Sequence, residues 1–161
     1  MKNTPAADAG PTGPVLLVSS QGGHLAHLLA LRSWWEDRDR LWVCPDTPDV
    51  VDRLEGERVV RSFSPTTRHL PNLVRNAVLA VRVLRRERPS IVVSAGAGVA
   101  VPFFVAARAL DIPTVFIEVY DRFDSATMTG RLCGPFTTRR IVQWQSQLEF
   151  YPDARLVGPL L

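Results

Sequence analysis

The sequence predicts an α/β protein with a Rossmann-like, doubly wound parallel sheet, and two observations lead to this fold class. First, short runs that are wholly apolar recur along the chain, such as residues 15–18 and 91–93. Such runs are typical of strands that are buried on both faces, as the strands of parallel sheets are. Second, segments of helical length stand between these runs, and strands alternating with helices indicate right-handed crossovers within one parallel sheet.

The predicted elements follow in a regular order. Strands are expected at 15–18, 41–43, 58–61, 91–93 and 114–117, and two later ones at 140–142 and 155–157. Helices are expected at 24–35, 49–54, 70–88 and 99–110, and a polar loop at 64–69. The helix at 70–88 has the clearest pattern, because Leu73, Ala77, Val81 and Leu84 form one apolar stripe and Pro89 marks its end.

The chain of 161 residues has the length of one domain with a sizeable core. Residues 1–13 are rich in Pro, Gly and Ala and lack the apolar core of a signal peptide. They are expected to form a disordered tail before a single domain at 14–161. The uncharged run at 91–107 contains two glycines and a proline, so a buried strand, a turn and a helix explain it better than a membrane span. The chain ends just after a predicted strand, where a linker to a second domain would be expected to begin.

Composition excludes several functional classes. The net charge is only +3, and no helix or finger motif that recognises bases is present, so no nucleic-acid partner is expected. Cys44 and Cys133 lie far apart, without metal-ligand spacing or a CxxC motif, and are interpreted as reduced, buried thiols of a cytosolic protein. No metal and no other cofactor is expected.

Two glycine loops carry the main functional signal. The first glycine loop is residues 20–24 (Ser-Gln-Gly-Gly-His), after the first predicted strand, and the second is residues 94–98 (Ser-Ala-Gly-Ala-Gly), after the fourth. Both would lie at the carboxyl edge of the sheet, where ligands bind in such folds, and glycine allows the backbone to approach a ligand closely. Together with the free N–H groups of a helix start, they would bind a phosphate or diphosphate. The residues predicted to do so are Ser20, Gln21, Gly22, Gly23, Ser94, Gly96 and Gly98. The alternative is that these glycines serve packing alone.

The spacing of the glycines argues against a dinucleotide-binding site. The first loop does not follow G-x-G-x-x-G, and in the second Val101 stands where the third glycine belongs. No acidic residue ends a strand at the expected distance, because Asp111 comes too early and Glu118 ends the next strand. A nucleotide-binding oxidoreductase is therefore a disfavoured alternative.

His24 and Glu118 are the candidate catalytic residues. His24 lies at a helix start beside the glycines, where its imidazole could accept a proton or bond a sugar hydroxyl. The alternative is a histidine that caps the helix. Glu118 ends an apolar strand at the ligand edge and could act as a base, or it could form a salt bridge to Arg122.

Taken together, these motifs resemble the Alg-fourteen-like oligosaccharide biosynthesis family, which includes PssD-type bacterial proteins, and more distantly MurG. The resemblance covers nearly the whole chain after residue 14. It rests on the two glycine loops and on later motifs in the family's order: Val101-Pro102, Ile117-Glu118 with Arg122, Ser125 with Thr129-Gly130-Arg131, Gln143-Trp144, Tyr151-Pro152 and Val157-Gly158. Arg131 departs from the lysine that is usual there, which keeps the charge but changes the geometry. Many members also carry an N-terminal membrane anchor, which is not expected in this chain.

The resemblance implies that the chain is the N-terminal, acceptor-side half of a GT-B glycosyltransferase. In such a family a second polypeptide supplies most of the UDP-sugar site, and the active site forms between the two chains. It further implies that Arg122 and Arg131 assist binding of the lipid-linked saccharide acceptor and that Gln143 and Trp144 face the partner. The expected location is the cytoplasmic face of a membrane, as a peripheral protein.

The resulting hypothesis is an inverting glycosyl transfer without a metal, in which His24 or Glu118 takes the proton of the attacking hydroxyl and UDP leaves on the partner chain. Arg75, Arg82 and Arg86 lie near one face of the helix at 70–88, which suggests contact with an anionic membrane surface. The alternative is a solvated charged face. A second alternative is a non-catalytic scaffold that only docks the donor-binding subunit at the membrane.

Overall fold

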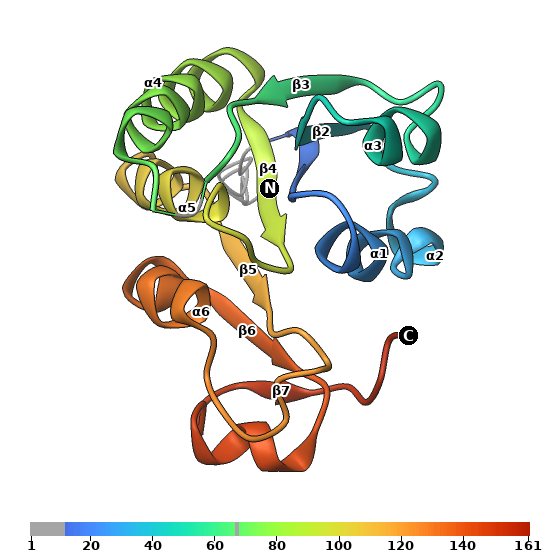
Figure 1. Cartoon of the computed structure of the whole chain (residues 1–161), viewed down its shortest axis with the longest axis vertical. Helices are drawn as coiled ribbons and strands as arrows, with labels where there is room; N and C mark the ends of the chain where they lie inside the picture. The colour runs from blue at the N-terminus through green and yellow to red at the C-terminus, as the bar shows by residue number, and fades with distance from the viewer. Residues whose placement is uncertain (1–11, 67) are drawn as a thin grey trace, which may run out of the picture.

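A computed structural model describes residues 12–66 and 68–161 and contains one sheet of seven parallel strands with helices on both faces (Figure 1). The strand order is β3-β2-β1-β4-β5-β6-β7, and every pair of neighbours is parallel. The strands span Gly13–Val18 (β1), Arg40–Pro45 (β2), Val59–Ser62 (β3), Pro89–Ser94 (β4), Thr114–Ile117 (β5), Arg139–Val142 (β6) and Arg155–Leu156 (β7). The predicted fold class is therefore confirmed.

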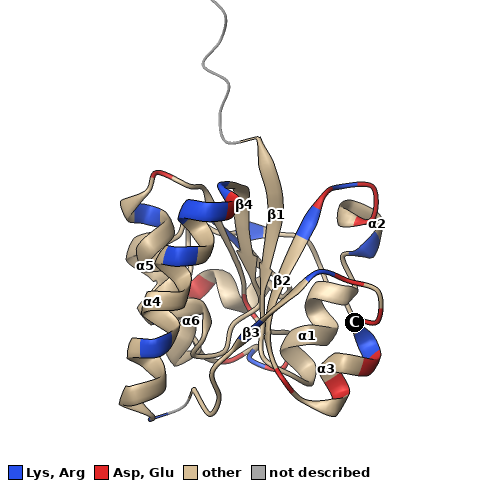
Figure 2. Cartoon of the chain, turned by 90° about the horizontal axis from the view of Figure 1, so that it is seen from above, with Lys and Arg blue, Asp and Glu red and all other residues tan. Residues whose placement is uncertain are grey.

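Six helices cover the sheet in the described part of the chain, three on each face, as Figure 2 shows. On one face lie α1 (Gly23–Leu29), α2 (Arg32–Trp35) and α3 (Pro48–Arg53), and on the other α4 (Leu70–Glu87), α5 (Ala100–Ala109) and α6 (Met128–Cys133). Two short 3-10 helices, η1 (Gly134–Phe136) and η2 (Gln145–Glu149), flank β6. Strands β1 to β3 are added toward one edge of the sheet and β4 to β7 toward the other, so the order of the strands reverses between the neighbours β1 and β4. In such folds ligands bind at this point, beyond the carboxyl ends of the strands.

The core consists of two apolar layers, one on each side of the sheet. Because side chains alternate along a strand, Leu16 and Val18 of β1 pack with α4 and α5, whereas Val15 and Leu17 pack with α1 and α3. Both layers are fully buried at the centre of the sheet, which fixes the positions of the loops that leave β1 and β4.

Several element boundaries differ from the prediction. The predicted helix at 24–35 is divided into α1 and α2, and the indole N–H of Trp35 donates to the Leu28 carbonyl at 2.8 Å across the break. The sequence prediction did not include α6, which begins after Thr127, where the threonine hydroxyl accepts from the Gly130 N–H. The predicted disordered tail falls largely on residues 1–11, which lie outside the described residues, and Gly13 already belongs to β1.

The apolar stripe predicted for α4 is confirmed only in part. Leu84 is buried and Ala77 half-buried, but Leu73 and Val81 are exposed. The other buried residues of α4 are Asn72, Asn76, Ala80 and Val83. The buried asparagines explain the difference, because the Asn76 side chain bonds both the N–H and the carbonyl of Phe63, at 3.0 and 2.9 Å. At Asn76, α4 is held to the protein by polar contacts, although a hydrophobic pattern alone would place this polar residue on the exposed face.

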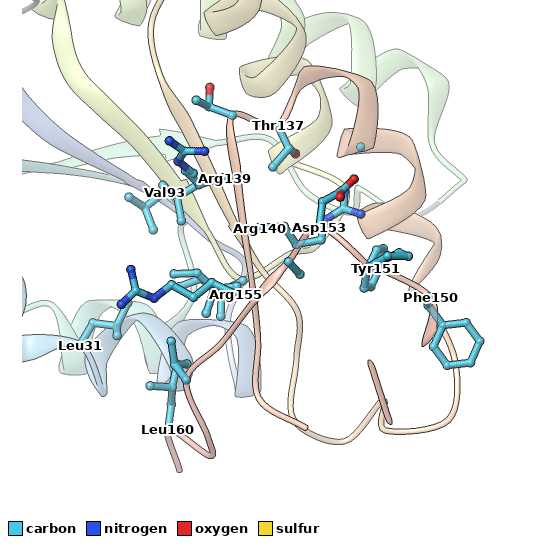
Figure 3. Close-up of a pocket in the computed structure, with 18 of the residues that line it drawn as sticks. Leu31, Val93, Thr137, Arg139, Arg140, Phe150, Tyr151, Asp153, Arg155 and Leu160 are labelled. Atoms are coloured by element: carbon cyan, nitrogen blue, oxygen red, sulfur yellow. The ribbon is translucent and has the colours of Figure 1, made fainter. Parts of the chain in front are cut away.

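Beside β5 and β6, the face of the sheet that carries α1 has a broad hollow with a volume of about 1250 Å³ (Figure 3). Val115 and Ile141 line it and are only half-buried, and Leu31, Trp34, Val157 and Leu160 lie around them. Because parallel sheets are normally covered by helices on both faces, this open sheet face is an unusual feature of the chain.

Candidate functional site

The two glycine loops lie side by side, as the sequence predicted. They leave β1 and β4, and Val18 is in register with Ser94 at the ends of these strands. His24 joins the loops, because its Nδ1 lies 2.9 Å from the Ala95 carbonyl oxygen. A carbonyl can only accept, so in the neutral ring Nδ1 carries the hydrogen and Nε2 is left as the proton acceptor.

Gly96 makes this position of His24 possible. Its φ is +114°, and a Cβ at this position would lie 3.1 Å from His24 Cε1 and 3.2 Å from His24 Nδ1. Any side chain would therefore be strained in its backbone and would press on the imidazole. Gly96 therefore leaves the space that the His24 ring occupies, and through this packing it fixes the position of the imidazole at the site.

A cleft of about 590 Å³ opens between the two loops and the ends of β2 and β3. Ser20, Gln21, His24 and Gly98 are the predicted site residues that line it. Several lining residues were missed from the sequence, and most of them carry hydroxyls: Thr47, Ser62, Ser64, Thr66 and Thr129. Their only sequence signal is that Thr47, Ser62 and Ser64 follow or end predicted strands at the same carboxyl edge.

The chain itself already uses part of the predicted diphosphate surface. The Gly22 N–H donates to a carboxylate oxygen of Asp49 at 2.9 Å, and Asp49 also pairs with Arg53 at 2.9 Å. The carboxylate therefore occupies one amide of the first loop, and its charge opposes an anion at that point. Gly23 is exposed, with nothing within 4 Å of the position of a Cβ.

In the second loop, Ser94 and Gly98 shape the backbone. Ser94 is fully buried, and its hydroxyl accepts from the Gly96 N–H at 3.1 Å. A Cβ on Gly98 would lie 3.0 Å from the Thr66 carbonyl oxygen, so the absence of a side chain allows the 64–66 segment to pack against the loop. For Gly98, the alternative that the loop glycines serve packing therefore agrees with the structure.

Glu118 is buried, with an exposed fraction of 1%, and does not line the cleft. Its carboxylate accepts from the Thr127 hydroxyl at 2.9 and 3.1 Å and from the Tyr151 hydroxyl at 2.6 Å. Burial, followed by these interactions with Glu118, raises the pKa of Tyr151 above its usual range. The Glu118 carboxylate thus bonds hydroxyl groups and does not form the salt bridge to Arg122 that was considered as the alternative to a base. The carboxylate holds the start of α6 and the segment between η2 and β7 against the end of β5.

The loop after β5 is fixed by two glutamines. Gln143 is buried, its amide nitrogen donates to the Glu118 carbonyl at 2.9 Å, and its amide oxygen accepts from the Leu160 N–H at 2.8 Å. Gln147, which sequence analysis did not identify, donates to the carbonyls of Val119 and Arg122. Gln143 is only 1% exposed, so its predicted contact with a partner stays a prediction that this burial disfavours.

The remaining predicted residues lie outside the cleft lining. Trp144 is partly exposed, and its indole N–H donates to the Tyr120 carbonyl. The side chains of Arg122 and Arg131 are exposed, on the loop after β5 and on α6. His27 is buried and links α1 to the same loop, since its Nε2 accepts from the Tyr120 N–H at 3.2 Å.

Comparison with known proteins places this arrangement in a family. A family model described as "Oligosaccharide biosynthesis protein Alg14 like" matches residues 57–160, well over half of the chain. The chain belongs to this Alg14-like family. The resemblance drawn from the sequence motifs is therefore confirmed.

Relatives within and near the Alg14-like family are named as N-acetylglucosamine transferases. The chain is 33% identical over 122 residues to the UDP-N-acetylglucosamine transferase subunit ALG14 of Eremothecium gossypii, covering 70% of this chain and 54% of that protein. Human ALG14 is 25% identical over 178 residues, covering 91% of this chain and 82% of that protein. A UDP-N-acetylglucosamine–N-acetylmuramyl-(pentapeptide) pyrophosphoryl-undecaprenol N-acetylglucosamine transferase of Parasynechococcus marenigrum is 32% identical over 136 residues, covering 74% of this chain and 37% of that protein. The chain thus spans about half the length of the first of these relatives.

Solved structures agree on the fold. MurG of Acinetobacter baumannii matches with a TM-score of 0.74 at 16% identity, over 90% of this chain and 45% of MurG. The S. aureus MnaA–UDP structure matches with a TM-score of 0.72 at 10% identity, over 92% of this chain and 46% of that chain. At these identities the likeness concerns the fold alone, and it supports the GT-B class that the sequence predicted for the Alg14-like chain.

Proposed function

We propose that the chain is the acceptor-binding and membrane-recruiting subunit of a two-chain, UDP-sugar-dependent glycosyltransferase that acts on a lipid-diphosphate-linked saccharide. The observation that carries the proposal is His24, which is held by the Ala95 carbonyl at the cleft between the glycine loops. Its Nε2 has no hydrogen-bond partner among the described residues. A positioned imidazole of this kind is suited to general-base catalysis. The names of the relatives, UDP-N-acetylglucosamine transferases and their subunits, supply the reaction class and suggest N-acetylglucosamine as the sugar.

In the proposed reaction an acceptor hydroxyl attacks the anomeric carbon of the UDP-sugar. A carbon–oxygen bond forms to the acceptor, the bond from the sugar to the diphosphate of UDP breaks, and UDP leaves with the electron pair on the partner chain. His24 Nε2 takes the hydroxyl proton. The configuration at the anomeric carbon is inverted, and no metal or other cofactor is part of the proposal.

The acceptor diphosphate is proposed to lie on the Gly23 side of the first loop. There the N–H groups of Gly23 and His24 begin α1 without an intrahelical partner, and the side chains of Ser20 and Gln21 line the cleft. The Gly22 side is less suitable, because Asp49 occupies that amide. Arg122 and Arg131 stay as proposed cationic contacts of the acceptor.

Glu118 is proposed to position these groups and not to act as the base. Its two oxygens are buried and accept three hydrogen bonds from two hydroxyls, so an acceptor cannot reach them without displacing Thr127 or Tyr151. The proton acceptor of the reaction is therefore assigned to His24 alone.

Membrane contact is proposed through the outer face of α4. Leu70, Val74 and Val78 are exposed by 69%, 58% and 56%, next to the arginines that Figure 2 shows in blue along this helix. An exposed apolar stripe with flanking cations suits the interface of an anionic bilayer. In the described part of the chain, no helix combines the length and the apolar character needed to cross a bilayer.

The membrane proposal can be tested with vesicles. Val74→Ser with Val78→Ser is expected to weaken binding to anionic phosphatidylglycerol vesicles, with unchanged thermal stability because both side chains are exposed. Val51→Ser, an exposed valine on α3 of the opposite layer, is the matched control. Equal vesicle binding by all three proteins would contradict the assignment of α4.

The donor-binding partner is proposed to cover the open sheet face beside β5 and β6. This face has half-buried apolar side chains and a hollow large enough for side chains of another chain. Val157→Asp introduces a charge at an exposed position on its rim and is expected to abolish co-purification with the partner. Val51→Asp, which places the same charge elsewhere, should leave the complex intact.

The reaction is tested by co-expressing the chain with a candidate donor subunit and measuring transfer of radiolabelled UDP-N-acetylglucosamine to a lipid-linked acceptor in membranes. His24→Asn retains an N–H that can bond the Ala95 carbonyl but lacks a comparable base, and it is expected to lower kcat by about 10²- to 10⁴-fold. If His24→Asn binds the partner and transfers at the normal rate, His24 is not the base. A normal rate for His24→Asn would favour the scaffold alternative.

A further inference from the structure

The cleft beside His24 has a wall of hydroxyl groups that the function proposed so far does not use. Thr47 follows β2, Ser62 ends β3, and Ser64 and Thr66 lie in the loop that follows. Thr47 Oγ1 and Ser62 Oγ are both buried and have no hydrogen-bond partner within the described chain. Buried polar atoms are nearly always paired, so two unpaired hydroxyls in the wall of one cleft require an explanation.

Thr47 is notable because its position would normally give it a partner. It is the N-cap residue of α3, where a threonine hydroxyl ordinarily accepts from the first turn of the helix, yet its side chain makes no capping bond. Ser62 is only 8% exposed, and rotation to another staggered rotamer moves its hydroxyl without moving the backbone. Neither hydroxyl has a partner within the described chain, so rotation about χ1 can turn each of them toward a molecule in the cleft.

The chemistry of the lining favours a neutral ligand over an anionic one. Among the described residues that line the cleft, none is an arginine or a lysine. Hydroxyls both donate and accept, as sugar hydroxyls do, whereas phosphate oxygens mainly require donors and cations. Asp49, whose carboxylate bonds the Gly22 N–H next to the lining residue Gln21, further disfavours a phosphate here.

Size and position agree with a sugar ring. The cleft of about 590 Å³ lies within the range of small-molecule sites, and Pro45, Ala97 and Val99 add apolar surface against which the C–H face of a pyranose can pack. His24 lines the same cleft, so a ring placed against the hydroxyl wall has its own hydroxyls near the free Nε2.

We propose that the cleft wall formed by Thr47 and Ser62 is a subsite for the uncharged pyranose ring that carries the attacking hydroxyl of the acceptor. The subsite rests on the proposed function, and it separates the acceptor into two parts. The sugar lies between His24 and the ends of β2 and β3, and the diphosphate lies on the first glycine loop, away from the hydroxyl wall. Thr47 and Ser62 then determine which sugar is accepted, because each bonds a ring hydroxyl whose orientation differs between sugars.

The test uses the full chain labelled with ¹⁵N and titrated with methyl α-glucoside, methyl α-galactoside, methyl N-acetyl-α-glucosaminide and, separately, inorganic pyrophosphate. At least one glycoside is expected to shift the amide signals of Thr47, Ser62 and Ser64 in the hydroxyl wall. Pyrophosphate is not expected to shift these three, because its proposed contacts are on the first glycine loop. The double variant Ser62→Ala, Thr47→Val is expected to bind that glycoside about tenfold more weakly. Its thermal stability should be unchanged or higher, since the removed hydroxyls had no partners.

Thr114→Val is the matched control. Its hydroxyl is equally buried but bonds the Phe136 carbonyl at 2.6 Å, and Thr114 begins β5 at the opposite edge of the sheet. This variant should lose stability and keep glycoside binding. The subsite is refuted if the double variant binds the glycoside as well as the parent chain, if none of the glycosides shifts the amides of Thr47, Ser62 and Ser64, or if pyrophosphate shifts these three.

The transfer assay separates this proposal from the function on which it rests. Glycoside binding that depends on both hydroxyls, in a chain pair without transferase activity, would refute the proposed reaction and leave the sugar subsite standing. Full transferase activity and an unchanged acceptor KM in the double variant would refute the subsite and leave the reaction standing.

Discussion

Gly130→Ala should destabilise this protein, although the same change in most helices has the opposite effect. Gly130 lies within α6, where alanine ordinarily gains about 1 kcal/mol over glycine. Here a Cβ would lie 2.5 Å from the Tyr151 hydroxyl, 2.6 Å from Glu118 Oε2 and 2.9 Å from Thr127 Oγ1. These are the atoms that hold the buried carboxylate, so the added methyl group has no space unless the cluster moves.

The magnitude follows from the terms that oppose each other. Insertion of a methyl group into a packed site costs about 1–3 kcal/mol, and a weakened hydrogen bond to the buried carboxylate costs about 1.5–3 kcal/mol more. After subtraction of the gain in helix propensity, a net loss of about 1.5–5 kcal/mol is expected. For a chain of this size that corresponds to a fall in Tm of about 3–20 °C.

Urea unfolding followed by tryptophan fluorescence measures this loss directly. Gly23→Ala is the matched control, because Gly23 also lies in a helix but has nothing within 4 Å of a Cβ, and its stability should be unchanged or slightly raised. Combining Gly130→Ala with Tyr151→Phe removes the nearest clashing atom, so the double variant should be less destabilised than the sum of the two single changes. A Gly130→Ala protein as stable as the parent would refute this account of the Glu118 cluster.

Three further predictions concern the stability and reactivity of buried groups. The hydrogen bonds from Arg40, at 2.6 and 2.8 Å, lower the pKa of Glu57 in the folded state. The ionised carboxylate therefore stabilises the fold above the unfolded-state pKa of about 4.3, and this stabilisation is lost as the pH falls through the folded-state pKa. Glu57→Gln should cost about 1 kcal/mol in urea unfolding at pH 7 and progressively less below about pH 4. Burial raises the pKa of the Cys44 and Cys133 thiols to about 12, and Ellman's reagent at pH 8 is therefore expected to label neither of them until urea unfolds the chain; rapid labelling of the native protein would contradict this. Asn76→Ala leaves two backbone groups of the loop after β3 without partners and should reduce the free energy of unfolding by about 2–4 kcal/mol, whereas a loss below 1 kcal/mol would show that water replaces the amide.

The sequence predicted the features that depend on local pattern. The predicted strand ranges overlap all seven strands, and the central ones, β1 and β4, were located by apolar runs. The glycines after β1 and β4 located the two loops at the carboxyl edge, because strand ends and helix starts are set by nearby residues. His24 was placed beside the loops for the same reason, and its role as a base stays a prediction.

Features that depend on contacts distant in sequence were not predicted. The buried side of α4 carries Asn76, whose partner Phe63 lies thirteen residues earlier, and no periodicity of apolar residues can show this. Glu118 has the appearance of a base from its place at a strand end, but Tyr151, which bonds it, belongs to a segment 33 residues later. The hydroxyl wall was missed because Thr47 and Ser62 come together only when β2 and β3 pair.

The open sheet face beside β5 and β6 has a consequence for the amount of each chain in the cell. An apolar sheet face without a cover tends to bind other apolar surfaces, so a copy of the chain with this face exposed is prone to aggregation and degradation. A partner that covers the face, as proposed, would stabilise the folded state by mass action. The abundance of this chain would then follow that of the proposed partner.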